Sequence, residues 1–96
     1  AYKEYNKKPV KPFFLGESTY EGEHDSWGSA LQARKQAYWS VLSGGTGHAY
    51  GSPLWKLDSS WRNHLDLPGA ISLKHLYTLF ASRAWEKLVP DTANLV

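Results

Sequence analysis

The sequence predicts an α/β fold built from two consecutive βα units, and three observations predict it. Residues 13–15 form a short, wholly apolar run that Gly16 ends, as expected of a strand buried on both faces of a parallel sheet. Two stretches with helical spacing begin at Ser29 and Pro68. Between them, the glycine-bounded residues 46–51 lie where a second parallel strand returns after a crossover helix.

Length and composition restrict the chain to one small globular unit. Its 96 residues are too few for two domains, and a hydrophobic fraction of 42% with 15% aromatic residues argues against disorder. The net charge is only +2, and the basic residues are scattered along the chain apart from a lysine cluster near its start. Nucleic-acid binding needs a basic stripe or patch, so we expect no nucleic-acid partner. No apolar run approaches the roughly 18 residues of a membrane span, so we expect no membrane partner. Cysteine is absent and the histidines lack ligand spacing such as HxxxH, so we expect neither a metal nor a cofactor.

The first βα unit spans residues 11–45 and follows a polar, lysine-rich surface connection over residues 1–10. In a parallel sheet, functional groups lie just past the carboxyl ends of the strands, which is where Glu17 stands. Residues 18–28 then form a long irregular loop, and loops of this length in compact domains often carry function.

The helix of this unit is expected to begin at Ser29, because a hydroxyl three residues before Gln32 has the capping-box form. Spacing of three and four residues directs one stripe toward the core, namely Ala30, Leu31, Arg34, Ala37, Tyr38, Val41 and Leu42. The opposite face carries residues that should point mostly outward, namely Gln32, Lys35, Gln36 and Ser40. The pair Gly44-Gly45 supplies the left-handed stop expected at the end of the helix.

The second unit spans residues 46–90 and repeats the order of strand, long loop and helix. Pro68 opens its helix, which should fade from residue 83 onward and end before Pro90. Two strands alone would leave sheet edges and apolar helix faces uncovered. We therefore expect the chain to be one fragment of a larger domain, with residues 91–96 beginning the following segment.

Four stretches carry longer motifs, namely KPFFLGESTYEG at 11–22, RKQAYWSVLSGGTGHAYG at 34–51, LPGA at 67–70 and WEKLVPD at 85–91. In order and spacing these motifs resemble the carboxyl-terminal quarter of apiosidase-like glycoside hydrolases. The likeness covers nearly the whole chain from Lys11. Ser18 departs from the family pattern, in which proline is frequent at that position.

The resemblance implies a (β/α)₈ (TIM) barrel in which this chain supplies strands 7 and 8 with their helices. It also implies a retaining glycosidase that cleaves a polysaccharide or oligosaccharide, with a Glu nucleophile at the end of strand 7, the position that Glu17 matches. The acid/base would come from strand 4, in the missing amino-terminal part of the barrel. The chain alone is therefore expected to be inactive. A secreted or periplasmic location is also suggested by the resemblance.

The chemistry of retaining hydrolysis agrees with this assignment, because it needs one carboxylate to attack the sugar and a second carboxyl about 5 Å away to protonate the leaving oxygen. Glu21 is expected to support Glu17 or to bind a sugar hydroxyl, and an ordinary loop acid is the alternative for both. His48 and Tyr50 would point to one side of the second strand. There they either line the substrate pocket or pack in the core.

The tryptophans offer a second kind of site, because sugars stack their C–H faces on indole rings. The loop residues Trp27, Trp55 and Trp61 are candidate platforms, and Trp55 comes first because it closely follows the second strand. Trp39 and Trp85 are expected to fill the core. A non-catalytic carbohydrate-binding module built on the loop tryptophans is the alternative function.

Overall fold

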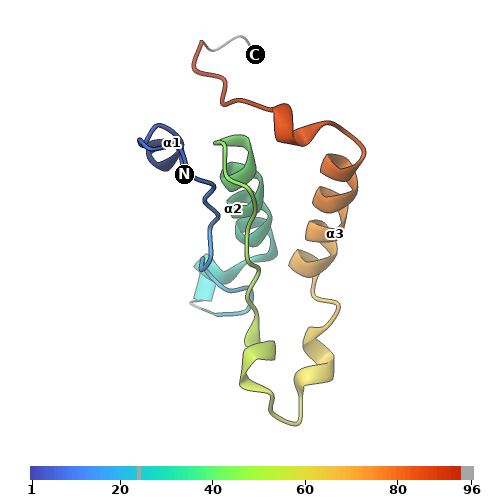
Figure 1. Cartoon of the computed structure of the whole chain (residues 1–96). Helices are drawn as coiled ribbons and strands as arrows, with labels where there is room; N and C mark the ends of the chain where they lie inside the picture. Colours follow the sequence, from blue (N-terminus) through green and yellow to red (C-terminus); the bar gives the residue numbers. More distant parts are fainter. Residues whose placement is uncertain (24, 94–96) are drawn as a thin grey trace.

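The computed structural model describes residues 1–23 and 25–93, and this part of the chain is helical and contains no sheet (Figure 1). Two long helices, α2 (Ala30–Leu42) and α3 (Pro68–Ala81), pack against each other and run in the same direction. The shorter helical segments are α1 (Tyr2–Tyr5), η1 (Asp25–Gly28), η2 (Pro53–Lys56), η3 (Trp61–His64) and η4 (Trp85–Lys87).

The predicted fold class is therefore wrong for the described residues, which do not form two βα units of a barrel. The two expected strands, residues 11–15 and 46–51, are extended segments that lie side by side in parallel. They share one isolated bridge, between Leu15 and His48. Backbone amides of Leu15 and Ala49 donate across this bridge to Gly47 and Leu15, over 3.2 Å and 2.9 Å.

The pairing does not extend into a ladder because the two segments fall out of register. The next contact beyond the bridge is the amide of Glu21, which donates to the carbonyl of Gly51 over 2.9 Å. Residues 16–20 separate these contacts on the first segment, whereas only Tyr50 separates Ala49 from Gly51 on the second. A regular parallel ladder needs equal steps on both chains. Residues 16–20 therefore bulge away from the second segment.

Local signals in the sequence correctly give the ends of α2. Ser29 is the N-cap, and its hydroxyl oxygen accepts from the amide of Gln32 over 3.1 Å. After Leu42 the chain turns at Gly44, whose φ of +89° is in the left-handed region that favours glycine.

The predicted outward face of α2 is wrong at two positions. Gln36 and Ser40 are buried, with exposures of 8% and 3%, whereas Leu31 of the predicted core stripe is 57% exposed. The reason is that both buried side chains form hydrogen bonds to chain segments beside the helix. Gln36 Oε1 accepts from the amide of Thr19 in the bulge over 3.0 Å, and the Ser40 hydroxyl donates to a carbonyl of the second extended segment. Hydrogen bonding to neighbouring segments thus outweighs the hydrophobic pattern of the helix.

Helix α3 begins at Pro68, as predicted, but it ends at Ala81, before the expected fading from residue 83 onward, and the short turn η4 follows it. Its contact with α2 is led by aromatic and small side chains: the rings of Tyr38 and Phe80 lie 6.1 Å apart, and the buried Gly69 lies against Ala33. Among the described residues, the buried apolar side chains are Ala33, Ala37 and Phe80.

The start of the chain carries α1 and is exposed throughout residues 1–12. Residues 94–96, within the segment expected to begin a following element, lie outside the described residues, as does His24. No helix in the described part of the chain is both long and apolar enough to span a bilayer.

Candidate functional site

Glu17 lies in the bulge just past the Leu15–His48 bridge, and its side chain is exposed. The hydroxyl of Tyr20 donates to Glu17 Oε1 over 3.4 Å, a long hydrogen bond. The negative charge of Glu17 raises the pKa of Tyr20 above its ordinary value, so the tyrosine keeps the proton that it donates. The bulge thus presents a carboxyl group that a neighbouring hydroxyl orients.

His48 lies against the same bulge. Its Nε2 is 3.1 Å from the hydroxyl oxygen of Ser18, the residue that follows Glu17. Burial lowers the pKa of His48, which favours the neutral ring. Its Nδ1 atom is buried and has no hydrogen-bond partner among the residues that the structure describes.

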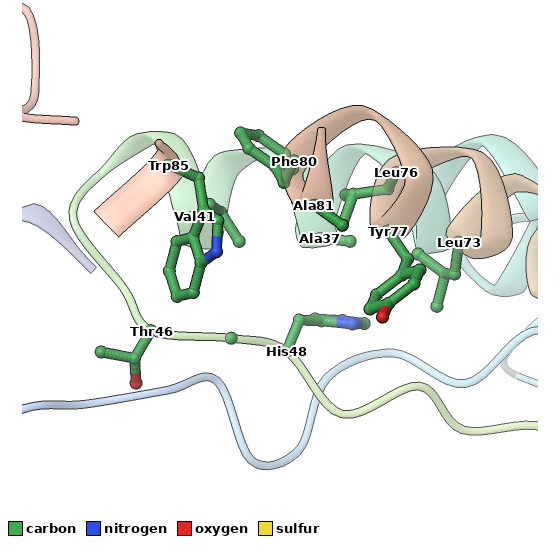
Figure 2. Close-up of a pocket in the computed structure, with 11 residues that line it drawn as sticks. Ala37, Val41, Thr46, His48, Leu73, Leu76, Tyr77, Phe80, Ala81 and Trp85 are labelled. Atoms are coloured by element: carbon green, nitrogen blue, oxygen red, sulfur yellow. The ribbon is translucent and has the colours of Figure 1, made fainter. Parts of the chain in front are cut away.

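A mainly apolar pocket of about 320 Å³ lies between His48 and the two long helices. Figure 2 shows the His48 ring extending below α3 toward Leu73 and Tyr77, with the Trp85 indole on the other side. The remaining labelled side chains of its wall are Ala37, Val41, Thr46, Leu76, Phe80 and Ala81. Few polar groups face this space.

Glu21 ends the bulge and is buried, with 6% of its surface exposed. Its Oε2 accepts from the hydroxyl of Tyr50 over 2.6 Å, and its Oε1 accepts from the backbone amide of Gly69 over 3.0 Å. Burial, followed by the contact with Glu21, raises the pKa of Tyr50 well above its ordinary range. Two residues predicted as substrate ligands are thus in contact with each other.

Trp55 stands on η2 at the far end of the extended segments, and it is 61% exposed. Its indole nitrogen donates to Glu23 Oε1 over 2.7 Å, and Lys56 Nζ lies 4.0 Å from the same oxygen. An exposed indole face held by its own N–H is a suitable surface for stacking a sugar ring.

The other tryptophans differ in exposure. Trp27 is 71% exposed, whereas Trp61 is partly covered by the Arg62 guanidinium, 4.3 Å from its ring centre. Trp39, which we expected in the core, is 57% exposed on α2. Trp85 is half-buried at the pocket wall.

The sequence reasoning missed Tyr20, Glu23 and Gln36 as partners of the site. Tyr20 carried a usable signal, because a tyrosine three residues after an acid in a tight bulge can reach back to it. Glu23 and Gln36 could not be found in this way, since their partners Trp55 and Thr19 depend on how distant segments pack.

A second cluster of Ser, His and Asp lies in the loop before α3. The Ser60 hydroxyl donates to Asp58 Oδ1 over 2.6 Å and lies 3.2 Å from His64 Nε2. A hydrolytic triad requires the aspartate on the other imidazole nitrogen, with the serine bonded to the histidine alone. The Ser60 bond lowers the pKa of Asp58, in an arrangement typical of a turn.

Cation-binding groups do not gather in the described part of the chain. No cluster of three or more His, Cys, Asp or Glu side chains there could hold a metal ion.

The chain matches a known protein family. The family model described as "Apiosidase-like, catalytic domain" matches residues 1–87. No curated protein and no solved structure matches the chain.

Proposed function

Because this chain belongs to the family of apiosidase-like catalytic domains, we propose that it carries the nucleophile of a retaining glycoside hydrolase and that this nucleophile is Glu17. The family is one of glycoside hydrolases, so the reaction class is cleavage of a glycosidic bond. The observation that carries the choice of residue is the placement of Glu17: it is exposed, just past the Leu15–His48 bridge, with a hydroxyl donor on its carboxyl group.

In the proposed reaction, a Glu17 oxygen attacks the anomeric carbon while the bond from that carbon to the leaving oxygen breaks. A second carboxyl group gives its proton to the leaving oxygen. Water, deprotonated by that second group, then releases the sugar from Glu17. Tyr20 supports this role of Glu17, because its hydroxyl orients the carboxyl group before attack.

The second carboxyl group is proposed to come from outside this chain. The two acids nearest in sequence are already engaged, since Glu21 is buried against Tyr50 and Gly69, and Glu23 accepts from Trp55. We therefore expect the isolated chain to lack hydrolytic activity. The natural protein that contains it is the one to assay.

Sugar contacts are proposed at two places, one on η2 and one next to the bulge that carries Glu17. Trp55 offers an exposed indole face, and the Ser18–His48 pair offers polar atoms next to the bulge. The substrate is proposed to be an oligosaccharide or polysaccharide. The description of the family makes apiosides the first substrates to try.

The alternative is a carbohydrate-binding module without catalysis. The high exposure of Trp27 and Trp55 favours it, since both indoles are available to a sugar. In the enzyme, these residues would instead form a substrate subsite. The two functions therefore differ in what Glu17 does.

The deciding experiment compares Glu17→Gln with Glu86→Gln, a matched change at an exposed acid on η4, in the natural protein. Turnover of aryl glycosides, apiosides included, should fall by at least about a thousandfold in Glu17→Gln. Oligosaccharide affinity, measured by calorimetry, should stay within a few-fold, and Glu86→Gln should behave as wild type. Azide should restore bond cleavage in Glu17→Ala, because a small anion can replace the missing carboxylate.

Two outcomes would contradict the proposal. Glu17→Gln with normal turnover would remove Glu17 from the reaction. A protein that binds the sugars through Trp55 and hydrolyses none of them would be a binding module.

A further inference from the structure

The bulge that carries Glu17 is held at both of its ends. At the start, Leu15 exchanges backbone hydrogen bonds with the second extended segment. At the end, Glu21 donates its amide to Gly51, and its side chain has two further partners. The position of Glu17 thus depends on two anchors, and the second anchor is a buried carboxyl group.

The second anchor reaches α3 through Gly69. This residue lies in the first turn of the helix, whose N-cap residue, Leu67, makes no capping hydrogen bond with its side chain. The Gly69 amide donates instead to Glu21 Oε1, which is at the helix end where a negative group is favoured. A Cβ atom at position 69 would overlap Glu21 Oε2 and lie 3.3 Å from the Cβ of Ala33. Only glycine leaves room for the carboxyl group there.

Tyr50 occupies the other oxygen of Glu21. Each oxygen of the Glu21 carboxyl group thus accepts one hydrogen bond from the protein, and only 6% of the residue is exposed. Little of the carboxyl group is left to contact a sugar hydroxyl. The Gly69 end of the network is buried as well.

Resting on the proposed function, we infer that Glu21 is a positioning residue that couples the first turn of α3, through Gly69, to the placement of the Glu17 carboxyl group. Movement of this helix end is transmitted to the bulge, because Glu21 is part of both. A sugar-binding Glu21 and a Glu21 that merely stabilises the fold are the two competing roles.

The test changes the two residues of this contact, Glu21 and Gly69, separately in the natural protein. Glu21→Ala removes both contacts, whereas Glu21→Gln keeps them, since its carbonyl can accept from Gly69 and its amide can donate to the Tyr50 oxygen. Gly69→Ala displaces the carboxyl group without changing it. Gly47→Ala is the matched control, because a Cβ there meets no atom within 4 Å.

We expect Glu21→Ala and Gly69→Ala to lower kcat by about 10- to 100-fold, since small displacements of a reacting group have effects of this size. KM should stay within about twofold, as expected when an interaction specific to the transition state is lost. Glu21→Gln and Gly47→Ala should keep kcat within a few-fold. If Glu21→Ala does not fold, Gly69→Ala and Glu21→Gln still form a complete pair.

A second measurement does not require turnover. The Thr19 amide lies inside the bulge and is bonded to Gln36, so its hydrogen exchange reports the order of the bulge. It should exchange about 5- to 100-fold faster in Gly69→Ala than in Gly47→Ala, because the loss of one buried hydrogen bond corresponds to a factor of about this size.

The outcomes distinguish the three roles. A raised KM with unchanged kcat in both Glu21 variants would overturn the inference in favour of a sugar ligand. A lower melting temperature with unchanged kcat and unchanged Thr19 exchange would overturn it in favour of a structural role. If wild-type protein hydrolyses no glycoside, or Glu17→Gln is fully active, the proposed function fails. In that case Thr19 exchange alone decides: faster exchange in Gly69→Ala supports the coupling, and equal exchange overturns it.

Discussion

The hydroxyl of Ser40 donates a 2.8 Å hydrogen bond to the backbone carbonyl of Gly47, and this bond ties α2 to the extended segment that carries His48. Ser40 is 3% exposed, so its hydroxyl has almost no access to water. The amide of Leu15 donates to the same carbonyl over 3.2 Å. One acceptor thus joins the helix and both extended segments at the base of the bulge.

Replacing Ser40 by Ala should lower the free energy of unfolding by about 1–2 kcal/mol, because the substitution removes the hydroxyl donor of a buried hydrogen bond. Urea unfolding measures the loss. Ser59→Ala, at an exposed turn position, should change the free energy by less than about 0.5 kcal/mol. Equal values for the two variants would show that the Ser40 bond contributes nothing.

Replacing Tyr20 by Phe should reduce kcat for glycoside hydrolysis by about 2- to 10-fold with little change in KM. The hydroxyl orients Glu17, but a hydrogen bond of 3.4 Å is long. We therefore expect a smaller loss of kcat than for a short hydrogen bond to a charged group. Steady-state kinetics of the natural protein give both constants. Tyr2→Phe, on the exposed α1, serves as control and should leave kcat and KM unchanged.

Replacing Trp55 by Ala should raise KM, or weaken oligosaccharide binding, by about 5- to 100-fold, in line with the loss of one stacking or aromatic contact of roughly 1–3 kcal/mol. Stability should hardly change, since the ring is 61% exposed. Calorimetric titration with oligosaccharide gives the affinity. Trp39→Ala, which removes an exposed indole from α2, should leave it unaltered. An affinity loss in both variants would argue against a specific platform at Trp55.

The stability of the protein should fall as the pH rises above about 10, and Tyr50 should account for part of that fall. Burial raises the folded-state pKa of Tyr50 above its unfolded value of 10.0. Below pH 10 both states hold the proton, so the contribution is fully present. Above pH 10 the unfolded state releases the proton first, which favours unfolding. Urea midpoints between pH 8 and 11 should therefore decline less steeply in Tyr50→Phe than in Tyr2→Phe, and parallel declines would contradict this origin.

Features of the sequence that act locally were predicted correctly. Ser29, Gly44 and Pro68 mark the helix boundaries through contacts or backbone angles within a few residues, so their effect does not depend on the rest of the fold. The apiosidase-like resemblance is likewise confirmed by the family model. The roles of Glu17 and Trp55 in a reaction remain predictions.

Features that depend on distant segments were predicted less well. The run at 13–15 has the composition of a buried strand, yet the chain offers it only one partner, out of register beyond Leu15, and no sheet forms in the described residues. Gln36 and Ser40 have polar side chains, so the pattern placed them outside. Their hydrogen-bond partners, in the bulge for Gln36 and on the second extended segment for Ser40, keep both side chains buried.

The sequence by itself determined where the two long helices begin, where α2 ends, which family the chain belongs to, and which acid follows the first apolar run. These properties reside in short stretches whose geometry is set by neighbours in the chain. The tertiary structure alone decided that Glu21 joins Tyr50 and the start of α3, and that the extended segments meet at a single bridge. Such contacts arise between residues far apart in sequence, where register and burial, which no local pattern encodes, select the partners.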